Sequence, residues 1–248
     1  MRGAAAEAPA GGAGAKPRLG IVAPVLDEAA ALAPWLATLQ PFRARGAQLV
    51  IVDGGSGDAT LDIARAQADL AFRAPRGRAS QMNAGAAACR AAGADVLLFL
   101  HADTRLPEDA DALVLDAVAR GAAWGRFDVR IDGPQAMLRI VERAMNLRSR
   151  LTGIATGDQA LFVRRDLFEA VGGFPAIPLM EDVALSRALK RHGRPACLRA
   201  RVVTSARRWH RHGIWRTIFL MWRLRAAYCL GADPARLADR YGYDRRES

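Results

Sequence analysis

Three aspartates that directly follow two apolar runs are the residues of this 248-residue chain best suited to binding chemistry. Asp53 and Asp58 follow the run Leu49–Val52, and Asp103 follows the run Val96–Leu100. Continuous Val, Ile, Leu and Phe runs of this length are typical of strands buried on both faces of a parallel sheet, and ligands bind at the carboxyl ends of such strands. Three carboxylates at that edge favour a metal ion or ribose hydroxyls over a bare phosphate.

The elements that must position these aspartates alternate along the chain. Strands are predicted at 19–25, 48–52, 70–74 and 96–100, and helices at 32–39, 59–68 and 79–91. This βαβαβαβ order indicates an α/β fold with right-handed crossovers. Beyond Pro107 the pattern predicts a helix to Ala119, a strand near 127–131, a helix over 135–150, a strand near 160–164 and a helix over 183–190.

Composition indicates one folded domain. The chain is 51% hydrophobic, which is enough for one large core, whereas residues 1–17 are nearly all Ala, Gly and Pro and are expected to form a disordered tail. The domain is expected over 18–248, with a first half at 18–105, a second half at 106–212 and a helical extension at 213–248. Three scattered cysteines, an odd number, indicate a reducing compartment, the cytoplasm.

The formal net charge of +11 raises the question of a polyanionic partner. Arginines are spread from Arg43 to Arg246 rather than gathered in one stripe, and neither zinc-finger spacing nor an RNA-recognition aromatic motif accompanies them. The pattern therefore predicts no nucleic-acid partner and ranks a membrane surface above it.

A dinucleotide-binding domain is disfavoured. Such a domain needs a glycine fingerprint between its first strand and first helix, where this chain reads APVLDEAA. The Gly-rich turn over 53–58 follows the second strand instead, and an acid at each end opposes phosphate.

Five segments in order resemble the motifs of family 2 glycosyltransferases: 24–28, 52–60, 77–85, 101–103 and 181–182. The resemblance extends from about Leu19 to Gly231 and is greatest to a small bacterial subgroup found beside radical-SAM, selenodomain and arsenic-related genes. It implies a GT-A fold, an α/β architecture whose mostly parallel, Rossmann-like sheet is flanked by helices. It also implies a nucleotide-diphosphate sugar donor and Mg²⁺ or Mn²⁺.

The resemblance assigns donor-binding roles in the first half. It places Pro24 and Glu28 against the nucleoside and Asp53 on the base, a role that suits a carboxylate, which accepts from a base N–H. For Asp58 we expect a helix cap rather than a ligand contact.

In the segment GRASQMNAG, the small residues allow close packing of a helix on the sheet. The polar side chains Arg78, Gln81 and Asn83 are expected to face the crevice, with Arg78 on the diphosphate.

Metal and catalytic roles follow from the same resemblance. Asp103 matches the metal-binding acid, while His101 stands where the family has a further acid and either joins the metal shell, favouring Mn²⁺, or bonds ribose. Asp182 matches the base that removes the acceptor's proton, and Glu181 is expected to orient acceptor or sugar. The alternative for both acids is that they complement the dipole of a following helix.

The segment 205–213 resembles a basic, tryptophan-containing loop that closes over diphosphate. Arg207, Arg208 and Trp209 are assigned to donor binding, and His210 or His212 to the metal shell, with a generic basic loop as the alternative.

The apolar segment 214–230 contains three arginines, which makes it a poor transmembrane helix. We expect it to dock mainly on protein, with Trp215 and Trp222 anchored in a core groove and Arg225 on a carboxylate. The alternative is a weak peripheral contact with the inner membrane face.

The resemblance and these residues together predict an inverting, divalent-metal-dependent enzyme. It is expected to transfer a hexose from a UDP-linked sugar donor to an unidentified hydroxyl. One alternative is a polyprenyl-phosphate sugar synthase, and another is a basic nucleic-acid- or membrane-binding module with a degenerate site. The sequence does not specify the sugar, the base, the acceptor or the oligomeric state.

Overall fold

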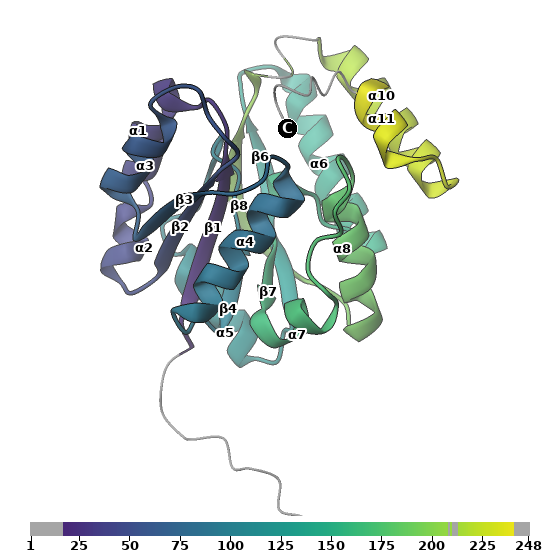
Figure 1. Ribbon diagram of the computed structural model, residues 1–248. Coiled ribbons are helices and arrows are strands. Elements are labelled where there is room, and N and C mark those ends of the chain that lie inside the picture. The colour runs from purple at the N-terminus through teal and green to yellow at the C-terminus, as the bar shows by residue number, and fades with distance from the viewer. Residues whose placement is uncertain (1–16, 208, 210–212, 241–248) are drawn as a thin grey trace, which may run out of the picture.

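The computed structural model describes residues 17–207, 209 and 213–240, and its centre is a curled eight-stranded sheet with helices on both faces (Figure 1). The strands are β1 (Leu19–Val25), β2 (Gln48–Asp53), β3 (Leu70–Arg73), β4 (Val96–Phe99), β5 (Thr104–Arg105), β6 (Trp124–Asp132), β7 (Phe162–Arg164) and β8 (Ala196–Ser205). Their order across the sheet is β3-β2-β1-β4-β7-β6-β8-β5.

The sheet is parallel in its first half and mixed in its second. Strands β1 to β4 pair in parallel, whereas β7 lies antiparallel to both β4 and β6, and β5 lies antiparallel to β8. The predicted α/β class is confirmed, and the second half is less parallel than expected because β7 enters the sheet in the opposite direction.

The helices cover both faces. They are α1 (Ala29–Ala37), α2 (Gln40–Ala44), α3 (Thr60–Gln67), α4 (Arg78–Ala91), α5 (Ala110–Ala119), α6 (Ala136–Thr152), α7 (Arg165–Ala170), α8 (Glu181–Leu189), α10 (Ile214–Cys229) and α11 (Pro234–Arg240), with short 3-10 turns at Gly157–Gln159 and Lys190–His192. Helices α1, α2, α3 and α5 pack on one face, and α4, α7 and α8 pack on the other.

The central strands β1 and β4 are apolar throughout, and β2 is apolar from Leu49 to Val52, because both faces of these strands are buried. Along β1, Ile21 packs with the α1 side and Val22 with the α4 side. Helix α4 sits close to the sheet at Gly85, where a Cβ atom would lie 2.3 Å from Cγ1 of Val22. The small residues of the GRASQMNAG segment thus permit the close packing that the sequence predicts.

Helix α10 faces the core with a different side from the one expected. Leu224 and Thr217 are buried, whereas Trp215 is 60% and Trp222 is 66% exposed. The prediction that the two tryptophans anchor in a core groove is wrong. Thr217, Leu220 and Leu224 share one side of the helix, because Leu220 and Leu224 follow Thr217 by three and seven residues, and this side faces the protein. In the described part of the chain, every helix is too short or too polar to cross a membrane.

Candidate functional site

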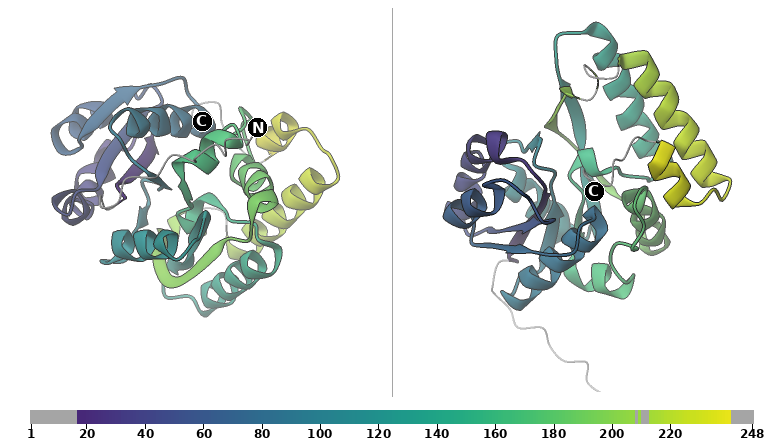
Figure 2. Two further views of the ribbon diagram at one scale, coloured as in Figure 1. Left: turned by 90° about the horizontal axis from the view of Figure 1, so that it is seen from below. Right: turned by 45° about the horizontal axis from the view of Figure 1, so that its top comes forward.

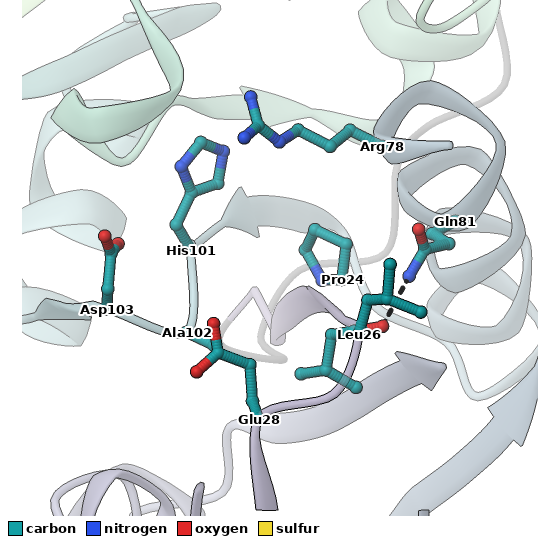
Figure 3. Close-up of a pocket in the computed structure, with 9 residues that line it drawn as sticks. Pro24, Leu26, Glu28, Arg78, Gln81, His101, Ala102 and Asp103 are labelled. Atoms are coloured by element: carbon teal, nitrogen blue, oxygen red, sulfur yellow. Dashed lines mark hydrogen bonds between the residues drawn. The ribbon is translucent and has the colours of Figure 1, made fainter. Parts of the chain in front are cut away.

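A cavity of about 150 Å³ opens at the carboxyl ends of β1 and β4, where the first-half motifs meet. We call it the strand-end cavity, and its lining is Pro24, Val25, Leu26, Glu28, Arg78, Gln81, His101, Ala102 and Asp103. Figure 3 shows Arg78 reaching from α4 toward the ring of His101, with the carboxylates of Glu28 and Asp103 beyond that ring. The structure thus brings together six of the residues proposed from the motifs.

The turn after β1 forms the wall of this cavity on the β1 side, and the turn after β2 supports it. Asp27 has a positive φ of 49°, and its Oδ1 accepts the N–H of Gly57 at 2.8 Å, while its own N–H donates to Oγ of Ser56 at 2.9 Å. The N–H of Glu28 donates to Oγ1 of Thr60 at 2.8 Å. The turn after β1 is therefore tied to the turn after β2, and these bonds fix the backbone that carries Glu28.

Glu28 is half-buried and lines the strand-end cavity. Burial raises the pKa of its carboxyl above the ordinary value, and Arg207, whose Nη2 is 3.6 Å from Oε2, opposes that rise. Arg207, predicted from the basic loop, thus does reach the site. Arg208 and His210, predicted from the same loop, and His212 lie outside the described residues.

Asp53 faces its own turn rather than the cavity. Its fully buried carboxylate accepts the N–H groups of Gly55 and Ser56, both at 3.0 Å from Oδ2, and Nε of Arg73 lies 3.4 Å away. This arrangement stabilises the Gly-rich turn, and the base contact proposed for Asp53 stays a prediction.

Asp58 makes the structural contacts that we expected of it. Its Oδ1 accepts the N–H of Thr60 at 2.9 Å and its Oδ2 accepts that of Ala29 at 3.2 Å, so one carboxylate joins the starts of α3 and α1. The hydroxyl of Thr60 and these N–H groups hold the pKa of Asp58 below its usual range.

The polar residues of α4 divide into different roles. Nε2 of Gln81 donates to the carbonyls of Val25 at 3.0 Å and Val52 at 2.8 Å, so this buried side chain joins the ends of β1 and β2. Asn83 exchanges two hydrogen bonds with the backbone of Phe174, at 2.8 and 2.9 Å. The expectation that Asn83 faces the crevice is wrong, because five residues of helix turn it about 140° away from Arg78.

His101 and Asp103 follow β4 and differ in exposure. The Cε1–Nε2 edge of the His101 ring lies against Gly157, where a Cβ atom would lie 2.4 Å from Cε1. Burial, together with the positive charge of Arg78, lowers the pKa of His101 to about 4, so the ring is neutral near pH 7. Asp103 is exposed, and it lines the strand-end cavity and two adjoining cavities.

One of these adjoining cavities, of about 260 Å³, contains Asp182, and we call it the aspartate cavity. Arg78, His101, Asp103, Asp158 and Asp182 all contribute to its wall. It continues from the strand-end cavity, because the first three of these residues line both. Acids from the first and second halves of the chain therefore meet in one connected space.

Asp182 is held in the first turn of α8. Its Oδ2 accepts the N–H of Gly157 at 2.8 Å and its Oδ1 accepts that of Val183 at 2.7 Å, while burial raises its pKa. Burial and the neighbouring charge of Asp182 also raise the pKa of Glu181 to about 7. The residue before these acids, Met180, has a φ of 71°, a left-handed conformation that is uncommon outside glycine and is concentrated at functional sites.

Asp158 is a residue of the aspartate cavity that the sequence analysis missed. Its Oδ1 accepts the hydroxyl of Thr156 at 2.5 Å, and burial raises its pKa while Arg148 opposes the rise. Thr156 and Gln159 form a capping box around the turn. The Thr-x-x-Gln spacing signals that turn, but it does not reveal that Asp158 lines the same cavity as Asp182.

Sequence comparison identifies a family. The chain matches the model of glycosyl transferase family 2 over residues 21–172. No curated protein matches this sequence.

Solved structures share the fold at low sequence identity. TarS of S. aureus superposes with a TM-score of 0.61 at 16% identity, covering 76% of this chain and 36% of TarS. The mannosyltransferase PcManGT of Pyrobaculum calidifontis, solved with GDP-Man and Mn²⁺, superposes with a TM-score of 0.60 at 19% identity, covering 92% of this chain and 70% of that one.

A third solved structure is glucosyl-3-phosphoglycerate synthase of Mycobacterium tuberculosis with Mg²⁺ and UDP. It gives a TM-score of 0.56 at 16% identity over 76% of this chain and 70% of that one. These likenesses confirm the expected GT-A architecture. Because the family model spans more than half of its residues, the chain belongs to glycosyl transferase family 2.

Proposed function

We propose that this protein is an inverting glycosyltransferase that moves a hexose from a nucleotide-diphosphate sugar, UDP-linked, to a hydroxyl group. The observation that carries the proposal is the connected space at the carboxyl edge of the sheet. Arg78, Asp103 and Asp182 face it from α4, the β4 end and α8. Among its charged groups are a cation for a diphosphate, an exposed acid and a half-buried acid.

The strand-end cavity is the proposed donor site. Pro24 and Glu28 border the nucleoside, and Arg78 neutralises diphosphate oxygens. Structural neighbours solved with UDP-GlcNAc or with GDP-Man support a nucleotide-sugar donor. The uridine base, the hexose and the likeness to the subgroup beside radical-SAM genes stay predictions.

The residues of this site fit a divalent ion that is bound together with a diphosphate. Among the described residues, no three His, Cys, Asp or Glu side chains lie close enough together to hold a metal alone. A hard divalent ion on a diphosphate needs only one or two protein carboxylates, since phosphate oxygens and water complete its shell. Exposed Asp103 fits that need, and neutral His101 is suited to join it in the case of Mn²⁺. The ion would stabilise the charge of the leaving diphosphate.

Asp182 is the proposed general base. Its two N–H partners, Gly157 and Val183, fix the orientation of the carboxylate toward the aspartate cavity. An oxygen of Asp182 takes the acceptor's proton while the acceptor oxygen attacks the anomeric carbon, and the nucleotide diphosphate leaves from the opposite face. Burial, which raises the pKa of Asp182, makes the carboxylate a stronger base.

Two substitutions test the proposal, with Asp62→Asn, at an exposed position of α3, as the matched control. Asp103→Ala is expected to abolish Mn²⁺-dependent binding of UDP or GDP in calorimetry. Asp182→Asn is expected to keep donor binding and to slow transfer by about 10²- to 10⁴-fold. Unchanged Mn²⁺-dependent affinity in Asp103→Ala removes that residue from the site. Wild-type transfer by Asp182→Asn favours the alternative of an already ionised phosphate acceptor, as in a polyprenyl-phosphate sugar synthase.

A further inference from the structure

An apolar groove runs between α6 and α10, which lie side by side in Figure 2. Its volume is about 530 Å³, within the range of ligand sites. Helix α6 contributes Met137, Ile140 and Val141, and α10 contributes Trp215, Ile218 and Trp222. Ile140, Trp215 and Trp222 are all more than half exposed, so the mouth of the groove presents large apolar side chains to solvent.

The groove opens at its inner end into the aspartate cavity. Four residues line both spaces: Asp158, Trp209, Met221 and Arg225. A molecule with its apolar part between α6 and α10 can therefore place its polar end beside Asp182. This continuity with the proposed catalytic acid distinguishes the groove from an ordinary exposed helix face.

Arg148 lines the groove and interacts electrostatically with Asp158, one of the residues that the groove shares with the aspartate cavity. Its Nε and Nη2 atoms are shielded from solvent and have no hydrogen-bond partner among the described residues. Burial lowers the pKa of Arg148, but the guanidinium stays charged. The charges of Asp158 and Asp182 oppose this shift. These two nitrogens form one edge of the guanidinium, whose parallel N–H groups match two oxygens of an anion. Buried charged donors without partners are rare, so these two nitrogens are candidates to bind an anion.

We propose that the acceptor is a lipid whose apolar chain lies in the α6–α10 groove, with an anionic group on Arg148 and a hydroxyl beside Asp182. This inference rests on the proposed function, because it uses Asp182 as the base. The hydroxyl oxygen bonds to the anomeric carbon and its proton passes to Asp182. The bond from that carbon to the diphosphate breaks, and the nucleotide diphosphate leaves with the electron pair.

Binding of three soluble probes tests the proposal without any knowledge of the sugar. They are 1-lauroyl lysophosphatidylglycerol, which has chain, anion and hydroxyls; 1-lauroylglycerol, which lacks the anion; and glycerol 3-phosphate, which lacks the chain. Titrations below the critical micelle concentration follow the emission of the groove tryptophans. We expect the first probe to bind at least about 10-fold more tightly than either of the others, as one charged hydrogen-bonded pair allows.

Paired variants assign the contacts. Arg148→Gln is expected to weaken the anionic probe about 10-fold and leave 1-lauroylglycerol unchanged, whereas Arg143→Gln, at an exposed position of α6 outside the groove, leaves both unchanged. Ala144→Trp, which fills the groove, is expected to block both lipids, with exposed Leu147→Trp as its control.

Equal binding of the two lipids by the wild type overturns the role of Arg148. Wild-type lipid affinity in Ala144→Trp overturns the groove, and if that variant does not fold, the Arg148 pair still decides the anionic contact. The proposed function is tested by a separate measurement. If neither UDP nor GDP binds at the strand-end cavity, the proposed function fails, and the lipid probes do not report on that binding.

Discussion

Gly157 separates His101 from Asp182, and replacing it with alanine tests the geometry of the aspartate cavity. A Cβ atom at this position would lie 2.4 Å from Cε1 and 2.5 Å from Nε2 of His101. Ordinary contact begins near 3.4 Å, so the ring or the turn must move by about 1 Å. The same residue donates its N–H to Oδ2 of Asp182, so movement of the turn also displaces the proposed base.

The expected effects have two magnitudes. Overpacking of this kind costs about 1–3 kcal/mol of unfolding free energy. A misplacement of about 1 Å at a reacting group lowers the transfer rate about 10²-fold. Urea denaturation measures the first effect, and steady-state transfer measures the second. Gly57→Ala is the control, because a Cβ atom there meets no atom within 4 Å.

A double-mutant cycle identifies the collision. If His101 is the obstacle, the stability cost of Gly157→Ala should largely vanish in a His101→Ala background, because the added methyl group then occupies the space of the ring. An equal cost in both backgrounds would show that the close contact with His101 is not what requires glycine at this position. If Gly157→Ala costs no stability in either background, the close packing around Gly157 is refuted altogether.

Three further outcomes are expected. The pKa of Glu181 is raised to about 7 from an ordinary 4.5, so its contribution to stability is complete below about pH 4.5 and is lost as the pH rises through 7; Glu181→Gln should flatten this part of a stability–pH curve measured by denaturation. Trp222→Ala should change the unfolding free energy by only about 0.5 kcal/mol, whereas Leu224→Ala, at a buried position of the same helix, should cost about 2–5 kcal/mol; equal costs would contradict the observed face of α10. Gly85→Ala should cost about 1–3 kcal/mol in thermal or urea unfolding, since its Cβ would press on Val22, and a neutral result would show that α4 can move away from the sheet.

The first half of the fold was predictable because its strands are continuous apolar runs bounded by turn residues. The second half was less so. Strand β8 carries Arg199 and Arg201 on its exposed side, which interrupts the apolar pattern, and the antiparallel entry of β7 depends on contacts far apart in sequence. Motif order located most of the candidate site, but it could not show that Asn83 holds the backbone of Phe174 or that Asp158 lines the aspartate cavity.

The prediction of which side of α10 is buried was wrong for a related reason. Large apolar residues lie on two sides of this helix, Trp215 and Trp222 on one and Leu220 and Leu224 on the other, so its pattern has no single apolar stripe. The buried side was decided by Leu179, Val183 and Leu237, which come from other elements. A single-helix pattern does not contain that information.

The hydrogen bonds between the turns after β1 and β2 have a consequence for the energetics of donor binding. Asp27, Ser56 and Asp58 fasten these turns to each other, so the backbone beside Glu28 is ordered by folding itself. A ligand that enters there does not have to immobilise a loose loop, and the associated entropy loss is absent from its binding free energy. The nucleotide side of the site is in this sense pre-organised. Selectivity for a donor would then arise from shape and charge complementarity to a rigid wall rather than from closure around whichever ligand arrives.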